Sequence, residues 1–174
     1  MRSQKRIVVA LYGRSCSGKS TTAHELSQLL NCPIHSAGER VRSRSKELGV
    51  TPTNLPLVEH RLIDDHTRAA AKTAVAPLIV DGSFLDALFC DLKDVYRIEL
   101  ICSAEERRRR FIQRSGHRGL DQRDKEDDNL RRALHVDCSR SPEATFDTTS
   151  KTPGEVAQEI FRWLETKTAA EVRG

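Results

Sequence analysis

Eight residues near the start of the chain, GRSCSGKS at 13–20, have the composition and spacing of a phosphate-binding loop. They match the Walker A pattern, in which glycines let the backbone curl until successive N–H groups point toward one anion. A helix after the loop adds the positive end of its dipole. We expect Lys19 to reach the outer phosphates of a nucleotide and the Ser20 hydroxyl to bind Mg²⁺. The residues predicted to hold the phosphate chain are Gly13, Ser15, Cys16, Ser17, Gly18, Lys19 and Ser20.

A carboxylate follows the apolar run PLIV at 77–80. Asp81 stands at the tip of a buried strand in a chain that has a phosphate loop. This position is typical of the second group that organises Mg²⁺, so the predicted metal-binding residues are Ser20 and Asp81. The alternative for Asp81 is a turn-forming Asp-Gly pair without a role in chemistry.

Arginines gather in two parts of the chain. The planar guanidinium fork suits phosphate oxygens, although a surface position in water is the simplest interpretation for any single arginine. An acceptor that already carries a phosphate needs cations around it, whereas an alcohol acceptor favours a positioned carboxylate. The arginines favour a phosphate acceptor, and Asp81 leaves the alcohol open. The two groups are Arg40, Arg42, Arg44, Arg61 and Arg68, and then 107–110, Arg114, Arg118 and Arg123.

Alternating strands and helices are expected to position these groups. Short β-branched runs separated by helical periodicity predict parallel crossover units. The predicted fold class is α/β, a three-layer α/β/α sandwich with about five parallel strands, in one domain over residues 1–174. The expected strands are 7–12, 34–36, 77–82, 96–102 and 145–148. The expected helices are 17–30, one opened by the capping box at 36–39, then 57–73, 104–114, 126–138 and 153–167.

Composition narrows the function classes. The chain has 174 residues, 37% hydrophobic residues, 31% charged residues and a net charge of +4, values typical of a globular protein. Only 5% of residues are aromatic, which disfavours nucleic-acid binding through stacked bases. No stretch approaches a membrane span. Five cysteines without metal-binding spacing favour reduced thiols in the cytoplasm, and the thiol of Cys16 lies where a helix N-terminus favours the thiolate.

The order of these segments resembles the nucleoside monophosphate kinases, and most closely the short archaeal-type cytidylate kinases. The stretches that carry the resemblance are GRSCSGKSTTAHELSQLL, IHSAGERVR, LIVDGSFLDAL, SAEERRRRFIQRSG, RDKEDDNLRRAL and FDTTSKTPGEVAQEIFRWL. The resemblance covers residues 7–48 and 77–165. It implies a kinase that uses ATP with Mg²⁺, an acceptor-binding segment at 37–76 and a small lid at 115–126.

The resemblance also implies roles for individual residues. Thr21 joins the loop residues at the donor phosphates. Ser36 and Arg40 or Arg42 would lie at the acceptor site. Ser83 also falls at this site, where the family commonly has an arginine that holds the acceptor phosphate. The predicted catalytic residues are Lys19, Asp81, Arg107, Arg110 and Arg123, of which the three arginines would neutralise the transferred phosphoryl group.

Three functions stay open on the sequence. The leading one is phosphoryl transfer to a nucleoside monophosphate, with CMP or dCMP as the best single acceptor, by a monomer or dimer. The second is a kinase for a hydroxylated metabolite of the shikimate or gluconate type. The third is a nucleotide-binding regulatory module without transfer. A GTPase is disfavoured because the guanine motif N-K-x-D is absent, and a AAA-type motor because the chain lacks room for a helical subdomain.

Overall fold

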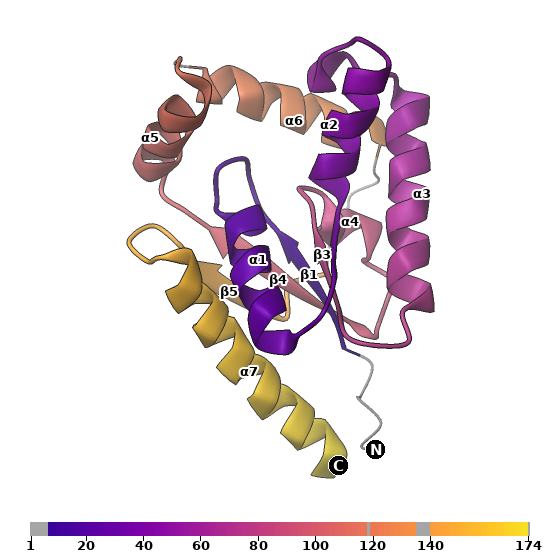
Figure 1. Ribbon diagram of the computed structural model, residues 1–174, viewed down its shortest axis with the longest axis vertical. Helices are drawn as coiled ribbons and strands as arrows, with labels where there is room; N and C mark the ends of the chain where they lie inside the picture. The colour runs from indigo at the N-terminus through magenta and orange to yellow at the C-terminus, as the bar shows by residue number, and fades with distance from the viewer. Residues whose placement is uncertain (1–6, 118, 135–139, 174) are drawn as a thin grey trace.

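Five parallel strands form the centre of the molecule in the order β2-β3-β1-β4-β5 (Figure 1). The computed structural model describes residues 7–117, 119–134 and 140–173. The strands are β1 Val8–Tyr12, β2 Ile34–Ser36, β3 Leu78–Asp81, β4 Val95–Ile101 and β5 Ala144–Asp147. The helices are α1 Lys19–Leu30, α2 Ala37–Glu47, α3 Leu57–Thr73, α4 Leu85–Leu88, α5 Ala104–Ser115, α6 Leu120–Leu134 and α7 Pro153–Arg173, with a 3-10 turn, η1, at Pro52–Asn54.

The sheet is covered by helices on both faces. All five residues of β1 are buried, as expected for a central strand of a parallel sheet. On one face, Val9 and Leu11 belong to a core cluster completed by α1 and α7. On the other face, Val8 and Ala10 pack with residues of α3 and α4. These two cores confirm the predicted α/β class with three layers.

Local sequence signals explain where several helices begin. Ser36 caps α2, because its hydroxyl oxygen accepts a hydrogen bond from the Glu39 N–H at 3.2 Å. This is the capping position predicted from the sequence. Ser103 caps α5 in the same way, with a 3.2 Å bond from the Glu106 N–H. The caps fix α2 and α5 directly at the ends of β2 and β4.

Some boundaries differ from the sequence prediction. Helix α6 begins at Leu120 instead of residue 126, because Leu120 is buried and anchors the first turn. The short α4 was not predicted, and buried Leu85 holds it. Helix α7 continues to Arg173 instead of residue 167, through a stretch that includes the helix-forming pair Ala169 and Ala170. The predicted helix end at residue 138 lies outside the described residues.

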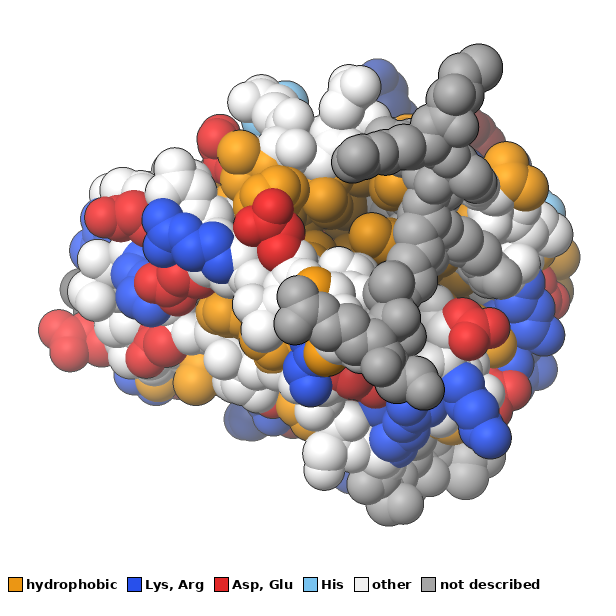
Figure 2. Space-filling view, turned by 90° about the horizontal axis from the view of Figure 1, so that it is seen from below, with side chains coloured by type: hydrophobic (Ala, Val, Ile, Leu, Met, Phe, Trp, Pro, Cys, Tyr) orange, Lys and Arg blue, Asp and Glu red, His pale blue; other side chains and the backbone are white. Residues whose placement is uncertain are grey.

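The strands all end at one edge of the sheet, and this edge carries the predicted site. Across neighbouring strands, Asp81 is paired in register with both Leu11 and Ser36. Seen from below, the opposite edge shows hydrophobic side chains gathered near its centre, with charged side chains around them (Figure 2). Among the described residues, none of the helices has the length and apolar character needed to cross a bilayer.

Candidate active site

The phosphate loop has a backbone that only this sequence pattern permits. Gly13 has φ of 144°, and a Cβ at this position would lie 2.3 Å from the Leu100 carbonyl oxygen. Any other residue would therefore collide with β4. Cys16 also adopts a left-handed conformation, with φ of 63°, which is uncommon for a residue with a side chain. The loop is thus held in a strained curl.

Lys19 opens α1 at the end of this loop. Its Nζ donates a hydrogen bond of 2.8 Å to the Arg14 carbonyl oxygen. Burial lowers the pKa of Lys19 to about 8, although the Asp81 and Asp127 carboxylates partly oppose that shift. The ammonium group is therefore partly desolvated. A bound phosphate anion would stabilise its charged form.

This pKa leads to a testable pH dependence of nucleotide binding. Phosphates would raise the pKa of Lys19 again, so binding should take up a proton once the free protein has lost it. We expect the affinity for a non-hydrolysable ATP analogue to be flat between pH 7 and 8. Above pH 8 it should fall by up to about tenfold per pH unit. Calorimetry in two buffers of different ionisation enthalpy measures both the affinity and the proton uptake.

Two variants separate Lys19 from its neighbours in that measurement. Lys19→Arg keeps its charge throughout the range and should show a flat profile. Cys16→Ser removes the thiol of the loop and should keep the wild-type profile. Binding without proton uptake above pH 8 would show that Lys19 does not meet the phosphates.

Asp81 and Ser20 form the predicted metal-binding pair. The Ser20 hydroxyl donates to Asp81 Oδ2 at 2.7 Å, and Asp81 is only 3% exposed. Asp81 Oδ1 is buried and has no hydrogen-bond partner among the described residues. A buried carboxylate oxygen of this kind is costly unless a cation meets it. An oxygen ligand set beside a lysine and a phosphate loop fits Mg²⁺.

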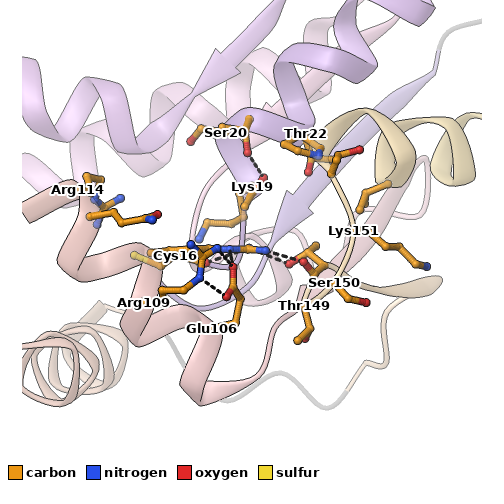
Figure 3. Close-up of a pocket in the computed structure, with 18 residues that line it drawn as sticks. Cys16, Lys19, Ser20, Thr22, Glu106, Arg109, Arg114, Thr149, Ser150 and Lys151 are labelled. Atoms are coloured by element: carbon orange, nitrogen blue, oxygen red, sulfur yellow. Dashed lines mark hydrogen bonds and ion pairs between the residues drawn. The ribbon is translucent and has the colours of Figure 1, made fainter.

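A cavity of about 700 Å³ opens beside the loop, and we call it the P-loop cavity. In Figure 3, Glu106 and Arg109 project from α5 into the same region as Lys19, with Thr149 and Ser150 from the loop after β5 on another side. Hydrogen bonds from Arg109 and Arg110 lower the pKa of Glu106 to about 2. The predicted loop residues that line this cavity are Cys16, Gly18, Lys19, Ser20 and Thr21.

Helices α5 and α6 both form hydrogen bonds with the phosphate loop at Ser15. Arg107 Nε donates to the Ser15 carbonyl oxygen at 2.8 Å, and the Ser15 hydroxyl donates to Asp127 Oδ2 at 2.8 Å. The same Arg107 guanidinium pairs with Asp124. Sequence reasoning missed Asp124 and Asp127, although their spacing of three places both on one face of a helix. Ser15 and Ser17 are both buried, and the Ser17 hydroxyl has no hydrogen-bond partner among the described residues.

The three arginines predicted to neutralise the transferred group are all engaged within the chain. Arg107 holds the loop as described. Arg110 donates to the Thr148 carbonyl oxygen at 2.6 Å and pairs with Glu106 at 2.8 Å. Arg123 pairs with Asp127 at 3.1 Å, one turn along α6. Their part in transfer stays a prediction. In this conformation Arg107 joins α5 to the phosphate loop, Arg110 joins α5 to the end of β5, and the pair of Arg123 lies within α6.

A second cavity of about 610 Å³ lies at the β2 edge of the sheet, between α2 and α3. We call it the edge cavity. Ser36 and Arg40 line it, as the acceptor-site prediction requires. Arg42 and Ser83 line neither of these two cavities. Sequence reasoning also missed the lining residues Glu59 and His66 of α3.

Comparison with known families places this site in a wider group. A family model described as "AAA domain" matches residues 9–131, well over half of the chain. The chain belongs to the AAA domain family. The matched part of this AAA domain runs from β1 into α6 and contains the phosphate loop, Asp81 and the arginines of α5. No curated protein matches the chain. The finer resemblance to cytidylate kinases therefore stays a prediction.

Solved structures share the fold of this AAA domain at low sequence identity. Shikimate kinase from Acinetobacter baumannii is 15% identical with a TM-score of 0.67, and the alignment covers 94% of this chain and 96% of that one. A gluconokinase from Sinorhizobium meliloti is 16% identical with a TM-score of 0.62, covering 90% of both chains. An APS kinase from Mycobacterium tuberculosis is 15% identical with a TM-score of 0.60, covering 93% and 99%. These similarities show that the chain has the fold of P-loop kinases.

Proposed function

We propose that the chain is an ATP-dependent phosphotransferase that moves the γ-phosphoryl group to a small acceptor bound in the edge cavity. The observation that carries this proposal is the pairing of Ser36 with Asp81 across β2 and β3. Neighbouring strands lie about 4.8 Å apart, so the edge cavity begins one strand away from Asp81, the carboxylate beside the phosphate loop. A nucleotide switch has no need of a second cavity at that point.

The residues divide into donor and acceptor groups under this proposal. Lys19 and the loop N–H groups would hold the phosphates, and Ser20 with Asp81 would hold Mg²⁺. Bound Mg²⁺ would neutralise charge that develops on the phosphate oxygens. Ser36 and Arg40 would bind the acceptor, and residues 115–126 would form part of a lid that excludes water from the transfer.

Two acceptor classes compete. A nucleoside monophosphate, CMP or dCMP first, is favoured by the order of the sequence segments. A hydroxylated metabolite is favoured by Ser83, which replaces the expected arginine, and by the buried Asp81 carboxylate, which suits an acceptor that must lose a proton. The similar solved structures of a shikimate kinase and a gluconokinase support this second class.

A panel of acceptors tests the proposed function. ADP formation would be followed with CMP, dCMP, UMP, AMP, dTMP, shikimate and gluconate, each against ATP alone. We expect ADP formation to rise several-fold with at least one acceptor, and a phosphorylated product to appear in equal amount. ATP hydrolysis that no acceptor changes would contradict the proposal and favour a nucleotide-binding regulatory module.

A further inference from the structure

The charged side chains around the edge cavity nearly cancel one another. The acids are Glu39, Glu47 and Glu59, and the bases are Arg40 and Arg44. Three carboxylates thus face two guanidinium groups. His35 also lines the cavity, and burial together with the nearby Arg40 lowers its pKa, so it is neutral near pH 7. The lining therefore has a small negative formal charge, which does not suit a dianionic phosphate.

All three guanidinium nitrogens of Arg44 donate hydrogen bonds to two of these acids. Its Nε and Nη2 donate to the Glu59 carboxylate at 2.8 and 3.0 Å, and its Nη1 donates to Glu47 at 2.9 Å. The two-pronged bond to Glu59 joins α2 to α3 across the cavity wall. These bonds also raise the pKa of Arg44 and lower that of Glu59. A phosphate ester would have to break them before it could use this guanidinium group.

Arg40 is the remaining guanidinium of the lining. It is exposed on α2, and no carboxylate of the described residues forms an ion pair with it. One guanidinium matches one monoanionic group, and phosphate sites usually gather more cations or backbone N–H donors. Other polar groups of the lining are the hydroxyls of Ser36 and Ser43, the carboxylate of Glu39 and the imidazoles of His35 and His66. Such groups exchange hydrogen bonds with alcohol groups.

We propose that the edge cavity takes a small, hydroxyl-rich acceptor that carries no phosphate, and that Glu47 and Glu59 exclude phosphate esters by occupying Arg44. This inference rests on the phosphotransferase function proposed above. In the transfer, an acceptor hydroxyl oxygen bonds to the γ-phosphorus and the bond from that phosphorus to the β–γ bridging oxygen breaks. ADP leaves, and the hydroxyl proton is released to solvent.

Matched acceptor pairs and one double variant test the inference. The pairs are cytidine and CMP, glucose and glucose 6-phosphate, and gluconate and 6-phosphogluconate. We expect the phosphate-free member to have at least tenfold higher kcat/KM in every pair that turns over. Glu47→Gln with Glu59→Gln keeps hydrogen-bond acceptors for Arg44 but removes both charges, and it should shrink that preference at least tenfold. Asp91→Asn, which removes the acid paired with Arg68 outside the cavity, should leave the preference unchanged.

A binding measurement keeps the inference testable without turnover. With the phosphate loop filled by a non-hydrolysable ATP analogue and Mg²⁺, inorganic phosphate should bind the double variant and not the wild type. Preference for the phosphorylated member of any pair, or equal phosphate binding by both proteins, would overturn the inference and leave the proposed kinase standing. Turnover of none of the six compounds, together with no acceptor response in the wider panel, would instead overturn the proposed function itself.

Discussion

Replacing Lys19 with alanine is expected to lower the rate of phosphoryl transfer at least about a thousandfold, which corresponds to ~4 kcal/mol of transition-state stabilisation. The reason is that Lys19 is the cation at the mouth of the phosphate loop, where charge develops on the transferred group. The ammonium group is partly desolvated in the free protein, which lowers its pKa to about 8. Its interaction with phosphate should therefore be strong.

The same variant should fold as well as the wild type. In the folded chain the lowered pKa of Lys19 means that its charge opposes folding at neutral pH, and this cost is lost only as pH rises from about 8 toward 10.5. Alanine removes that cost, so the melting temperature at pH 7 should not fall. Lys93→Ala, an exposed lysine before β4, is the matched control for activity and melting. Full activity of Lys19→Ala would rule out the proposed mechanism.

Asp81→Asn is the second large expected effect. We expect transfer to fall at least about a hundredfold and the Mg²⁺ concentration for half-maximal rate to rise. An amide is a weaker ligand than a carboxylate for a hard cation. The measurement is the steady-state rate over a Mg²⁺ titration. Asp94→Asn, exposed at the opposite edge of the sheet, is the control.

Thermal melting distinguishes a functional Asp81 from a structural one. Its Oδ1 has no hydrogen-bond partner within the described chain, so the neutral amide should leave the free protein at least as stable as the wild type. A large drop in melting temperature together with lost activity would favour the structural alternative, a turn-forming Asp-Gly pair. Unchanged Mg²⁺ dependence would remove Asp81 from the metal site.

Local patterns made the fold and the phosphate end of the site predictable. The loop at 13–20 carries its glycines at fixed offsets, and the cap at Ser36 requires only a residue three positions later. Asp81 could be placed beside the loop because parallel strands end at one edge of the sheet. In each case the signal lies within a few residues or follows from the strand order.

The sequence does not show which arginines are already paired with acidic residues. Arg44 is bound by Glu59, fifteen residues away on another helix, and Arg107 by Asp124, seventeen residues away across a turn. The sequence shows how many cations the acceptor side has but not which acids already occupy them. The prediction of a phosphate acceptor rested on how many arginines gather there, although a surface position was the simplest interpretation for any single one. For the same reason the hydrogen bond from Ser15 to Asp127 was not predicted.

The long-range ties to the phosphate loop affect the order in which the molecule is built. Ser15 is held by Arg107 and Asp127, and the Ser17 carbonyl oxygen accepts a 2.8 Å bond from Thr148, 131 residues later. Such contacts close large chain loops, and their entropy cost must be met before they stabilise anything. The phosphate loop leaves the ribosome before α5, α6 and Thr148, and it is therefore completed only after they have been made. A nascent chain that ends before β5 lacks Thr148 and so cannot yet form the finished nucleotide-binding loop.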